Sequence, residues 1–235
     1  MTQSSTRLAA ELPPCDYRPA VYDGPSRQQV LIDRQRFCNP AIFTLYSEPL
    51  MIVEGHLQYL FDETGRRYLD MLAGISTVSC GHCHPQVTQR VSRQLQRLQH
   101  ASTIYLHPNF SELAAKLATR LPGDLEVTYF TNSGSEANDL AVHLARLYTG
   151  YLDVVAVRSG YHGGSFGTMG LTGVHTWKYP SAQGTYIHHT ICPDPYRSPF
   201  EGTAEEIAEK SVQDMEQVIL SSTSGRIAGF LAEPI

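Results

Sequence analysis

One stretch, residues 127–141, constrains the fold more than any other, because a β-rich run passes there into a helical pattern. Residues 127–130 favour an extended strand. The apolar residues that follow recur at helical spacing: Ala137, Leu140, Ala141, Leu144 and Tyr148. Between the two patterns stand Asn132 and Ser133, residue types that favour a helix cap. The stretch predicts a strand, a tight turn and a helix whose apolar face packs on a sheet.

The turn in this stretch is Ser133-Gly134-Ser135. The first backbone N–H groups of a helix have no partner within the helix, and the helix dipole makes this end attractive to anions. A glycine and two hydroxyls at that place predict a phosphate site. For these three residues alone, an ordinary strand-to-helix connection is the alternative.

Two further apolar runs predict buried strands. Val154–Val157 is continuous, as in a strand covered on both faces, and Ile227–Leu231 is the third run. A helix that begins with the capping-box pattern of Thr203 and Glu206 lies between them. Strands that alternate with helices indicate right-handed βαβ crossovers and a mostly parallel sheet, so the fold class is α/β.

Each strand is followed by polar or aromatic candidates: Gly134 and Ser135, then Tyr161 and His162, then Glu233. Ligands of open α/β sheets bind at the carboxyl edge, so these residues predict a common site. The glycine-rich run from Arg158 to Gly167 fits neither a Walker loop nor a dinucleotide fingerprint. Its glycines would let a flat ligand approach the backbone beside Tyr161. A flexible surface loop is the alternative.

The first part of the chain has a different pattern. Residues 1–26 are proline-bearing and are expected to form an extended arm, followed over residues 27–70 by a helix and a small antiparallel meander. The expected helix is Gln28 to Cys38, and the expected strands are Leu50 to Val53, Leu57 to Phe61 and Arg67 to Leu69. Helices are also expected from Pro85 and over residues 109–120, and residues 171–203 are expected to be irregular.

Composition excludes several function classes. A net charge of −5 in 235 residues gives no basic excess for nucleic acid, and no apolar run has membrane-spanning length. His82, Cys83 and His84 are spaced too tightly to bind one tetrahedral ion together, so no metal site is predicted. Five scattered cysteines indicate reduced thiols.

The runs Phe130–Asn138 and Tyr161-His162-Gly163, at this separation, resemble the class III pyridoxal-phosphate (PLP) aminotransferases. Leu60–Asp70, Gly81–Pro85 and Ala232–Ile235 extend the resemblance, and within that family the chain is most similar to the mitochondrial alanine–glyoxylate type. The resemblance implies the N-terminal part of a fold-type I large domain over residues 71–235, with the small C-terminal domain absent.

The resemblance also implies roles for single residues. Gly134 and Ser135 would hold the phosphate of pyridoxal 5'-phosphate, Tyr161 would stack on its pyridine ring, and His162 would lie beside the ring. Glu233 would lie near the ring and the substrate. The substrate side would be bordered by three residues of one connector: Ile75, Ser76 and Thr77.

The resemblance implies transamination from an alanine-like amino acid to a glyoxylate-like 2-oxo acid. It also implies a homo-oligomer located in the mitochondrion or, otherwise, in the cytoplasm. In the family the Schiff-base lysine follows the Glu-Pro-Ile segment, and none of Lys116, Lys178 and Lys210 matches its context. The chain is therefore expected to be truncated before that lysine and inactive alone. The alternative is a non-catalytic fragment that associates with a full-length subunit.

Overall fold

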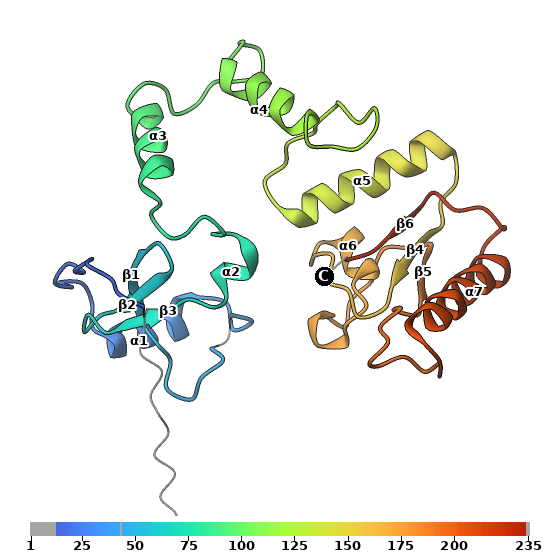
Figure 1. Ribbon diagram of the computed structural model, residues 1–235, viewed down its shortest axis with the longest axis horizontal. Helices are drawn as coiled ribbons and strands as arrows, with labels where there is room; N and C mark the ends of the chain where they lie inside the picture. The colour runs from blue at the N-terminus through green and yellow to red at the C-terminus, as the bar shows by residue number, and fades with distance from the viewer. Residues whose placement is uncertain (1–12, 43, 234–235) are drawn as a thin grey trace, which may run out of the picture. The chain divides into compact units, whose positions relative to one another are not determined.

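The computed structural model describes residues 13–42 and 44–233. The chain divides into two compact units, Met1–His107 and Pro108–Ile235 (Figure 1). This boundary lies later than the one expected after residue 70, and the division into residues 1–26, 27–70 and 71–235 stays a prediction. Part of the expected arm, residues 1–12, lies outside the described residues.

The first unit contains the predicted helix and meander. Helix α1 (Arg27–Phe37) begins after Ser26, whose hydroxyl accepts a hydrogen bond from the Gln29 N–H. The three strands pair antiparallel in the order β1-β2-β3, with the bounds β1 (Ile52–His56), β2 (Tyr59–Asp62) and β3 (Arg67–Leu69). The meander is confirmed, although its first strand lies later than expected.

Residues 13–25 contain no helix or strand and pack on this meander. The Tyr17 ring stacks on His56 with centroids 4.1 Å apart and lies 5.7 Å from the Phe61 ring. The Tyr59 hydroxyl donates to the Pro13 carbonyl at 2.8 Å. The arm thus helps to bury Tyr59 and Phe61, the two apolar side chains at the centre of the meander.

Two amphipathic helices follow, as predicted: α3 (Pro85–Leu95) in the first unit and α4 (Pro108–Ala118) at the start of the second. Pro85 takes the first helical position, where its missing N–H costs no hydrogen bond. The apolar face of α3 is only half-buried: Val87, Val91 and Leu95 are 49%, 52% and 53% exposed.

The second unit is built on a parallel sheet of three strands in the order β5-β4-β6. The strands are β4 (Val154–Val157), β5 (Ile187–Thr190) and β6 (Gly229–Leu231). The parallel sheet and two of its strands are confirmed. Strand β5 falls in the region that was expected to be irregular, so that expectation is wrong there.

The strand expected at residues 127–130 is a second error. This segment forms no strand, and it pairs with no strand among the described residues. Phe130 packs edge-on against Phe110 of α4, with centroids 4.8 Å apart, while Val127 is 81% exposed. β-Propensity favours an extended backbone, but a strand also needs a partner for its N–H and C=O groups.

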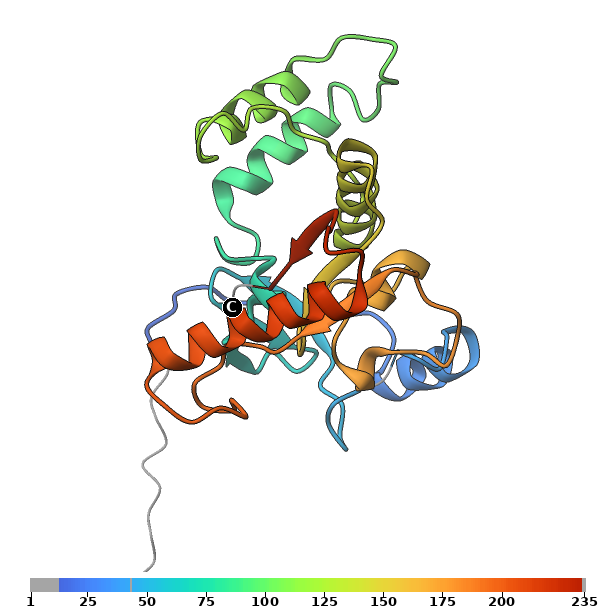
Figure 2. The same cartoon turned by 90° about the vertical axis from the view of Figure 1, so that its right-hand side faces the viewer.

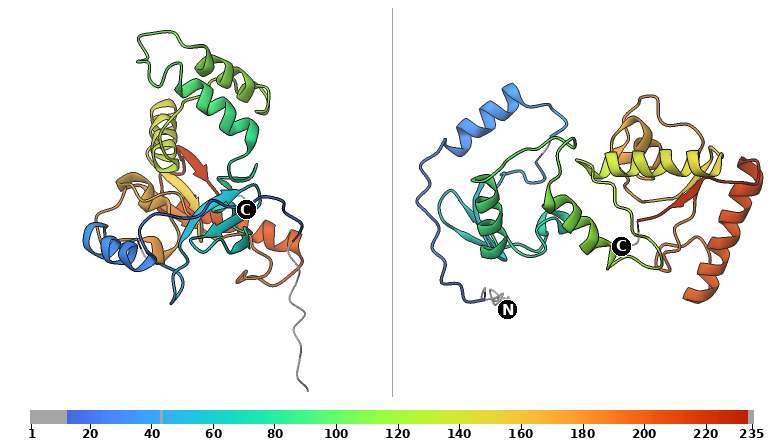
Figure 3. Two further views of the ribbon diagram at one scale, coloured as in Figure 1. Left: turned by 90° about the vertical axis from the view of Figure 1, so that its left-hand side faces the viewer. Right: turned by 90° about the horizontal axis from the view of Figure 1, so that it is seen from above.

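Helices cover both faces of this sheet (Figures 2 and 3). Helix α5 (Gly134–Thr149) packs on β6 and on α6 (Phe166–Leu171), whereas α7 (Ala204–Ser222) packs on β5. The chain crosses from β4 to β5 through α6, then back past β4 to β6 through α7. Because right-handed connections in opposite directions use opposite faces, α6 and α7 lie on different sides.

The core of this unit lies between the sheet and helices α5 and α6. Its buried members are Val154, Ala156, Leu171 and Ala228. Val142 and Ala145 of α5 pack against them. The apolar face predicted for this helix is wrong, because four of its five members are exposed: Ala137, Ala141, Leu144 and Tyr148. Among residues 13–42 and 44–233, no helix is both long and apolar enough to cross a bilayer.

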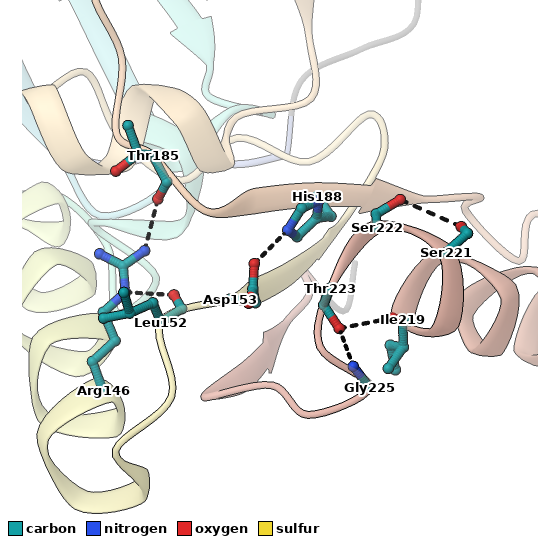
Figure 4. Close-up of polar contacts among 10 residues, drawn as sticks. All are labelled: Arg146, Leu152, Asp153, Thr185, His188, Ile219, Ser221, Ser222, Thr223 and Gly225. Carbon is teal, nitrogen blue, oxygen red and sulfur yellow. Dashed lines mark hydrogen bonds and ion pairs between the residues drawn. The ribbon is translucent and has the colours of Figure 1, made fainter.

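Polar contacts fix the amino ends of the strands (Figure 4). Asp153, just before β4, contacts His188 of β5 at 2.7 Å between Oδ1 and Nε2. Arg146 of α5 donates to the carbonyls of Leu152 and Thr185, each at 2.8 Å. These contacts lie at the amino ends of β4 and β5, and because the two strands are parallel their carboxyl ends lie at the opposite edge of the sheet.

Candidate functional site

The start of α5 is built by local capping. The Ser133 hydroxyl accepts the Glu136 N–H at 3.1 Å, and the Glu136 carboxylate accepts the Asn132 N–H at 2.7 Å. Gly134, the first helical residue, is exposed, and a Cβ added to it would meet nothing within 4 Å. The space beside the first helical residue is therefore open, as a phosphate site at this helix start would require.

Ser135 joins this helix to the loop after β4. Its hydroxyl oxygen accepts the Gly164 N–H at 3.2 Å. A Cβ at Gly163 would lie closer than 3.0 Å to the Ser135 hydroxyl, and Gly163 has a φ of +124°. Since a hydroxyl has one proton to donate as well as lone pairs to accept with, Ser135 keeps a donor for an anion.

His162 is held in the same loop. Its carbonyl accepts the Asn138 side-chain amide at 2.9 Å, and its N–H donates to the Thr172 hydroxyl at 3.0 Å. The imidazole is buried, and its Nε2 has no hydrogen-bond partner among the described residues. Burial lowers the pKa of His162, an effect that the negative charge of Glu233 opposes only in part. The ring is therefore neutral near pH 7.

Tyr161 and Glu233 meet where β4 and β6 end. The Glu233 carboxylate accepts the Tyr161 backbone N–H at 3.0 Å. The Tyr161 ring is 47% exposed and makes an edge contact with Trp177, with centroids 5.6 Å apart. The structure thus brings the five predicted residues Gly134, Ser135, Tyr161, His162 and Glu233 to one edge of one sheet.

The glycines of the loop have a role that sequence reasoning missed. Added Cβ atoms would lie closer than 3.0 Å to His162 Nε2 at Gly160 and to the Asp139 carboxylate at Gly167. With Gly163, three of these glycines make room for side chains of the protein. Only Gly164 has open space, with nothing within 4 Å of an added Cβ. At Gly160, Gly163 and Gly167, packing against side chains of the protein explains why the residue is glycine, so a flat ligand is not needed to explain it.

The expected substrate-side residues lie in the first unit. Ile75 and Ser76 are in α2 (Ala73–Ser76), a short turn whose backbone has positive φ values of 58° and 64° at these residues. The Thr77 hydroxyl donates to the Gly74 carbonyl. All three expected residues are exposed. Their place beside a substrate stays a prediction.

The two histidines that follow this connector differ: His82 has protein partners, whereas the buried Nδ1 of His84 has no hydrogen-bond partner among the described residues. His82 Nε2 contacts the Asp70 carboxylate at 2.7 Å, and the His82 backbone exchanges two hydrogen bonds with Leu57 at 2.7 and 2.8 Å. Within residues 13–42 and 44–233, no group of three His, Cys, Asp or Glu side chains is arranged to hold a metal ion.

The sequence profile of the family described as aminotransferase class-III matches residues 45–235. The alanine–glyoxylate aminotransferase 2 homolog 2, mitochondrial, of Arabidopsis thaliana is 49% identical over 233 residues, which cover 99% of this chain and 48% of that protein. The human alanine–glyoxylate aminotransferase 2, mitochondrial, is 39% identical over 253 residues, covering 100% and 49%. The chain spans about half the length of the curated relatives it matches.

Solved transaminases share the fold. An (S)-enantioselective omega-transaminase from Thermomicrobium roseum superposes with a TM-score of 0.81 at 30% identity, over 91% of this chain and 50% of that one. A PLP-bound amine transaminase from an uncultivated Pseudomonas species gives a TM-score of 0.76 at 26% identity, over 85% and 48%. Both sheets described above belong to part of a fold-type I domain. The chain belongs to the class III aminotransferases.

Proposed function

We propose that this chain takes part in PLP-dependent transamination, from an alanine-like amino acid to a glyoxylate-like 2-oxo acid. The names of the curated relatives support these substrates. One observation in the structure carries the proposal. The open start of α5 and the half-exposed Tyr161 ring lie on a single hydrogen-bonded edge, through Ser135–Gly164 and Tyr161–Glu233.

The residues at this edge fit a phosphorylated aromatic cofactor. The N–H groups at Gly134 and Ser135, with the Ser135 hydroxyl, would donate to the phosphate. Tyr161 would cover the ring, and Glu233 would keep Tyr161 in place by accepting its N–H. When bound, PLP supplies an electron sink for the negative charge that develops on the amino acid.

The unpartnered nitrogen of His162 is a second point of fit. A buried polar atom without a hydrogen bond is costly, by about 1–3 kcal/mol. His162 Nε2 is such an atom, and it belongs to a neutral ring between the loop and the sheet. We propose that it exchanges a hydrogen bond with a polar group of the ligand or with an ordered water molecule.

The remaining parts of the proposal concern the whole enzyme. We place Ile75, Ser76 and Thr77 at the substrate entrance. We also propose a homo-oligomer, supported by the half-exposed apolar face of α3, and a mitochondrial location, supported by the names of the curated relatives.

A titration of the purified chain with PLP, followed by absorbance, tests the cofactor site. We expect saturable binding that Ser135→Ala weakens by about tenfold, the value of one hydrogen bond to a charged group. Glu209→Gln, at an exposed position of α7, is the matched control and should bind as the unmodified chain does. Equal PLP affinity in Ser135→Ala and in the unmodified chain, or binding that does not saturate, would rule out this edge as the cofactor site.

Borohydride reduction of the PLP mixture, followed by peptide mass mapping, tests whether a lysine of this chain bonds the cofactor. We expect no stoichiometric label on Lys116, Lys178 or Lys210. Lys116 lies on α4, and Lys210 on α7 donates to the Glu201 carbonyl at 2.6 Å. Stoichiometric label at one of them would instead assign the bond-forming lysine to this chain and call for a transamination assay.

A further inference from the structure

One face of α5 lies along the glycine-rich loop for more than a helical turn. Ser135, Asn138 and Asp139 are three and four residues apart, so they share this face. Ser135 holds the Gly164 N–H at 3.2 Å and Asn138 holds the His162 carbonyl at 2.9 Å. Asp139 continues the row, and neither the family resemblance nor the proposed cofactor contacts give it a role.

Asp139 contacts the start of α6. Its Oδ2 lies 2.5 Å from the Ser165 hydroxyl, and the Ser165 hydroxyl lies 2.6 Å from that of Thr168. An ionised carboxylate only accepts, so Ser165 must donate to Asp139 and Thr168 must donate to Ser165. The Thr168 oxygen then accepts the Ser165 N–H at 3.1 Å, and the Ser165 oxygen accepts the Thr168 N–H at 3.2 Å. The carboxylate thus fixes the proton direction in the capping box of α6.

The Asp139 carboxylate also lies close to the backbone of α6 at Gly167. A Cβ at Gly167 would lie closer than 3.0 Å to the carboxylate. None of the ion pairs among the described residues includes Asp139, so its charge acts on the hydroxyls rather than on a lysine or arginine. A charge-assisted hydrogen bond to a hydroxyl at this distance is stronger than a neutral one.

We propose that Asp139 is a positioning residue for the cofactor site, an inference that rests on the proposed function. Through Ser165, it holds the start of α6 against α5. The loop between β4 and α6 is then held on α5 at two places, at His162 by Asn138 and at Ser165 by Asp139. Gly164 then stays against the Ser135 hydroxyl, and Tyr161 keeps a fixed place relative to the α5 terminus. Asp139 itself touches neither the phosphate nor the ring.

Four variants test this role: Asp139→Ala, Asp139→Asn, Ser165→Ala and the Asp139→Ala/Ser165→Ala double variant. We expect Asp139→Ala to weaken PLP binding by about tenfold, as expected for one lost charge-assisted hydrogen bond. Asp139→Asn keeps an oxygen acceptor and should lose less. If Asp139 acts through Ser165, its removal in the Ser165→Ala background should cause no further loss.

Hydrogen exchange of the Gly164 amide gives a readout that needs no cofactor. Asp139→Ala should speed this exchange by about tenfold, while amides of β4 remain protected as in the unmodified chain. Thermal unfolding identifies a variant that fails to fold, in which case Asp139→Asn carries the test. Glu209→Gln again serves as the matched acidic control.

The outcomes separate the two proposals. An unmodified chain that does not bind PLP would overturn the proposed function, and Gly164 exchange would still decide whether Asp139 clamps the loop. If Asp139→Ala leaves both PLP affinity and Gly164 exchange unchanged, the positioning role is overturned. Fully additive losses in the double variant would also overturn it, since Asp139 would then not act through Ser165.

Discussion

The Ser135 hydroxyl accepts the Gly164 N–H at 3.2 Å, and this bond joins the first turn of α5 to the loop after β4. The two residues are 29 positions apart in the chain. The start of α5 and Tyr161 of the loop thereby become parts of one surface. The close approach depends on Gly163, a buried residue at which an added Cβ would meet the Ser135 hydroxyl.

Gly163→Ala should destabilise the second unit, whereas Gly164→Ala should not. A Cβ at Gly163 would lie closer than 3.0 Å to the Ser135 hydroxyl, and the φ of +124° is unfavourable for any L-residue. We expect a loss of about 2–3 kcal/mol in the free energy of unfolding. At Gly164 the space is open, so the change should stay within about 0.5 kcal/mol. Urea unfolding of both variants measures the difference, and equal losses would contradict the packing argument.

The start of α5 and strand β4 were predictable because their signals are local. Ser133 is a cap residue directly before a helical period, and Val154–Val157 is an apolar run long enough for a covered strand. Strand β5 gave no such signal. It is an edge strand with the sequence Ile187-His-His-Thr190, and two of its four side chains are histidines that find polar partners.

The proximity of the candidate residues was predictable from the sequence, whereas the hydrogen bonds between them were not. Sequence reasoning placed Tyr161 and Glu233 at the ends of β4 and β6, so their proximity followed from a parallel sheet. The contact of Asp139 with Ser165 depends on which face of α5 meets the loop, and no local pattern encodes that. The Ser165-x-x-Thr168 spacing was the available signal for α6, since it satisfies both halves of a capping box.

In the first unit, the Asp62 carboxylate should be the main source of acid sensitivity. Burial alone would raise the pKa of Asp62, but hydrogen bonds from Thr64 and Tyr68 and from the Arg66 and Thr64 amides outweigh it and lower the pKa to about 2. The unfolded chain has the ordinary value of about 4. The stabilisation is therefore present above about pH 4 and is lost as the pH falls toward 2.

Asp62→Ala should lower the free energy of unfolding of this unit by about 2–3 kcal/mol at neutral pH, because Tyr68 and two amides lose a charged acceptor. The variant should also lose the decline in stability between about pH 4 and 2. Asp23→Asn, at an exposed position in the same unit, is the control. Parallel pH profiles for the two variants would contradict this account.

The connector between Asp70 and His82 should open when the contact between these two residues is removed. The Asp70 carboxylate accepts the Leu72 and Ala73 N–H groups at 2.9 and 3.0 Å, and its other oxygen contacts His82 at 2.7 Å. The His82 contact, followed by these amides, lowers the pKa of Asp70. The closing contacts are thus retained above the ordinary carboxyl pKa and are lost as the pH falls through the lowered value.

His82→Ala should make the connector between Asp70 and His82 sensitive to proteolysis, since its turn includes positive φ values at residues other than glycine, such as Ile75. His82→Gln should restore resistance in part, because its amide can donate to Asp70. His100→Gln, at an exposed position, should be cleaved like the unmodified chain. Cleavage mapped by mass spectrometry decides the case, and unchanged resistance in His82→Ala would show that the contact between His82 and Asp70 does not hold the connector.

The second unit should lose stability in mildly acidic solution because of two histidines, the buried His162 and the half-buried His189. Burial lowers the pKa of His162, against Glu233, and that of His189, against its contact with the Leu171 carbonyl. An unfolded histidine titrates near pH 6.5, so below that pH the unfolded chain binds protons that the folded chain does not. The free energy of unfolding should therefore fall as the pH drops from about 7 until the lowered pKa values are reached.

A His162→Gln/His189→Gln double variant should show a flatter profile between pH 7 and 5.5 than the unmodified chain, whereas His100→Gln should not. Urea unfolding at these two pH values measures the slopes, and an undiminished slope in the double variant would place the acid sensitivity of this unit in other groups.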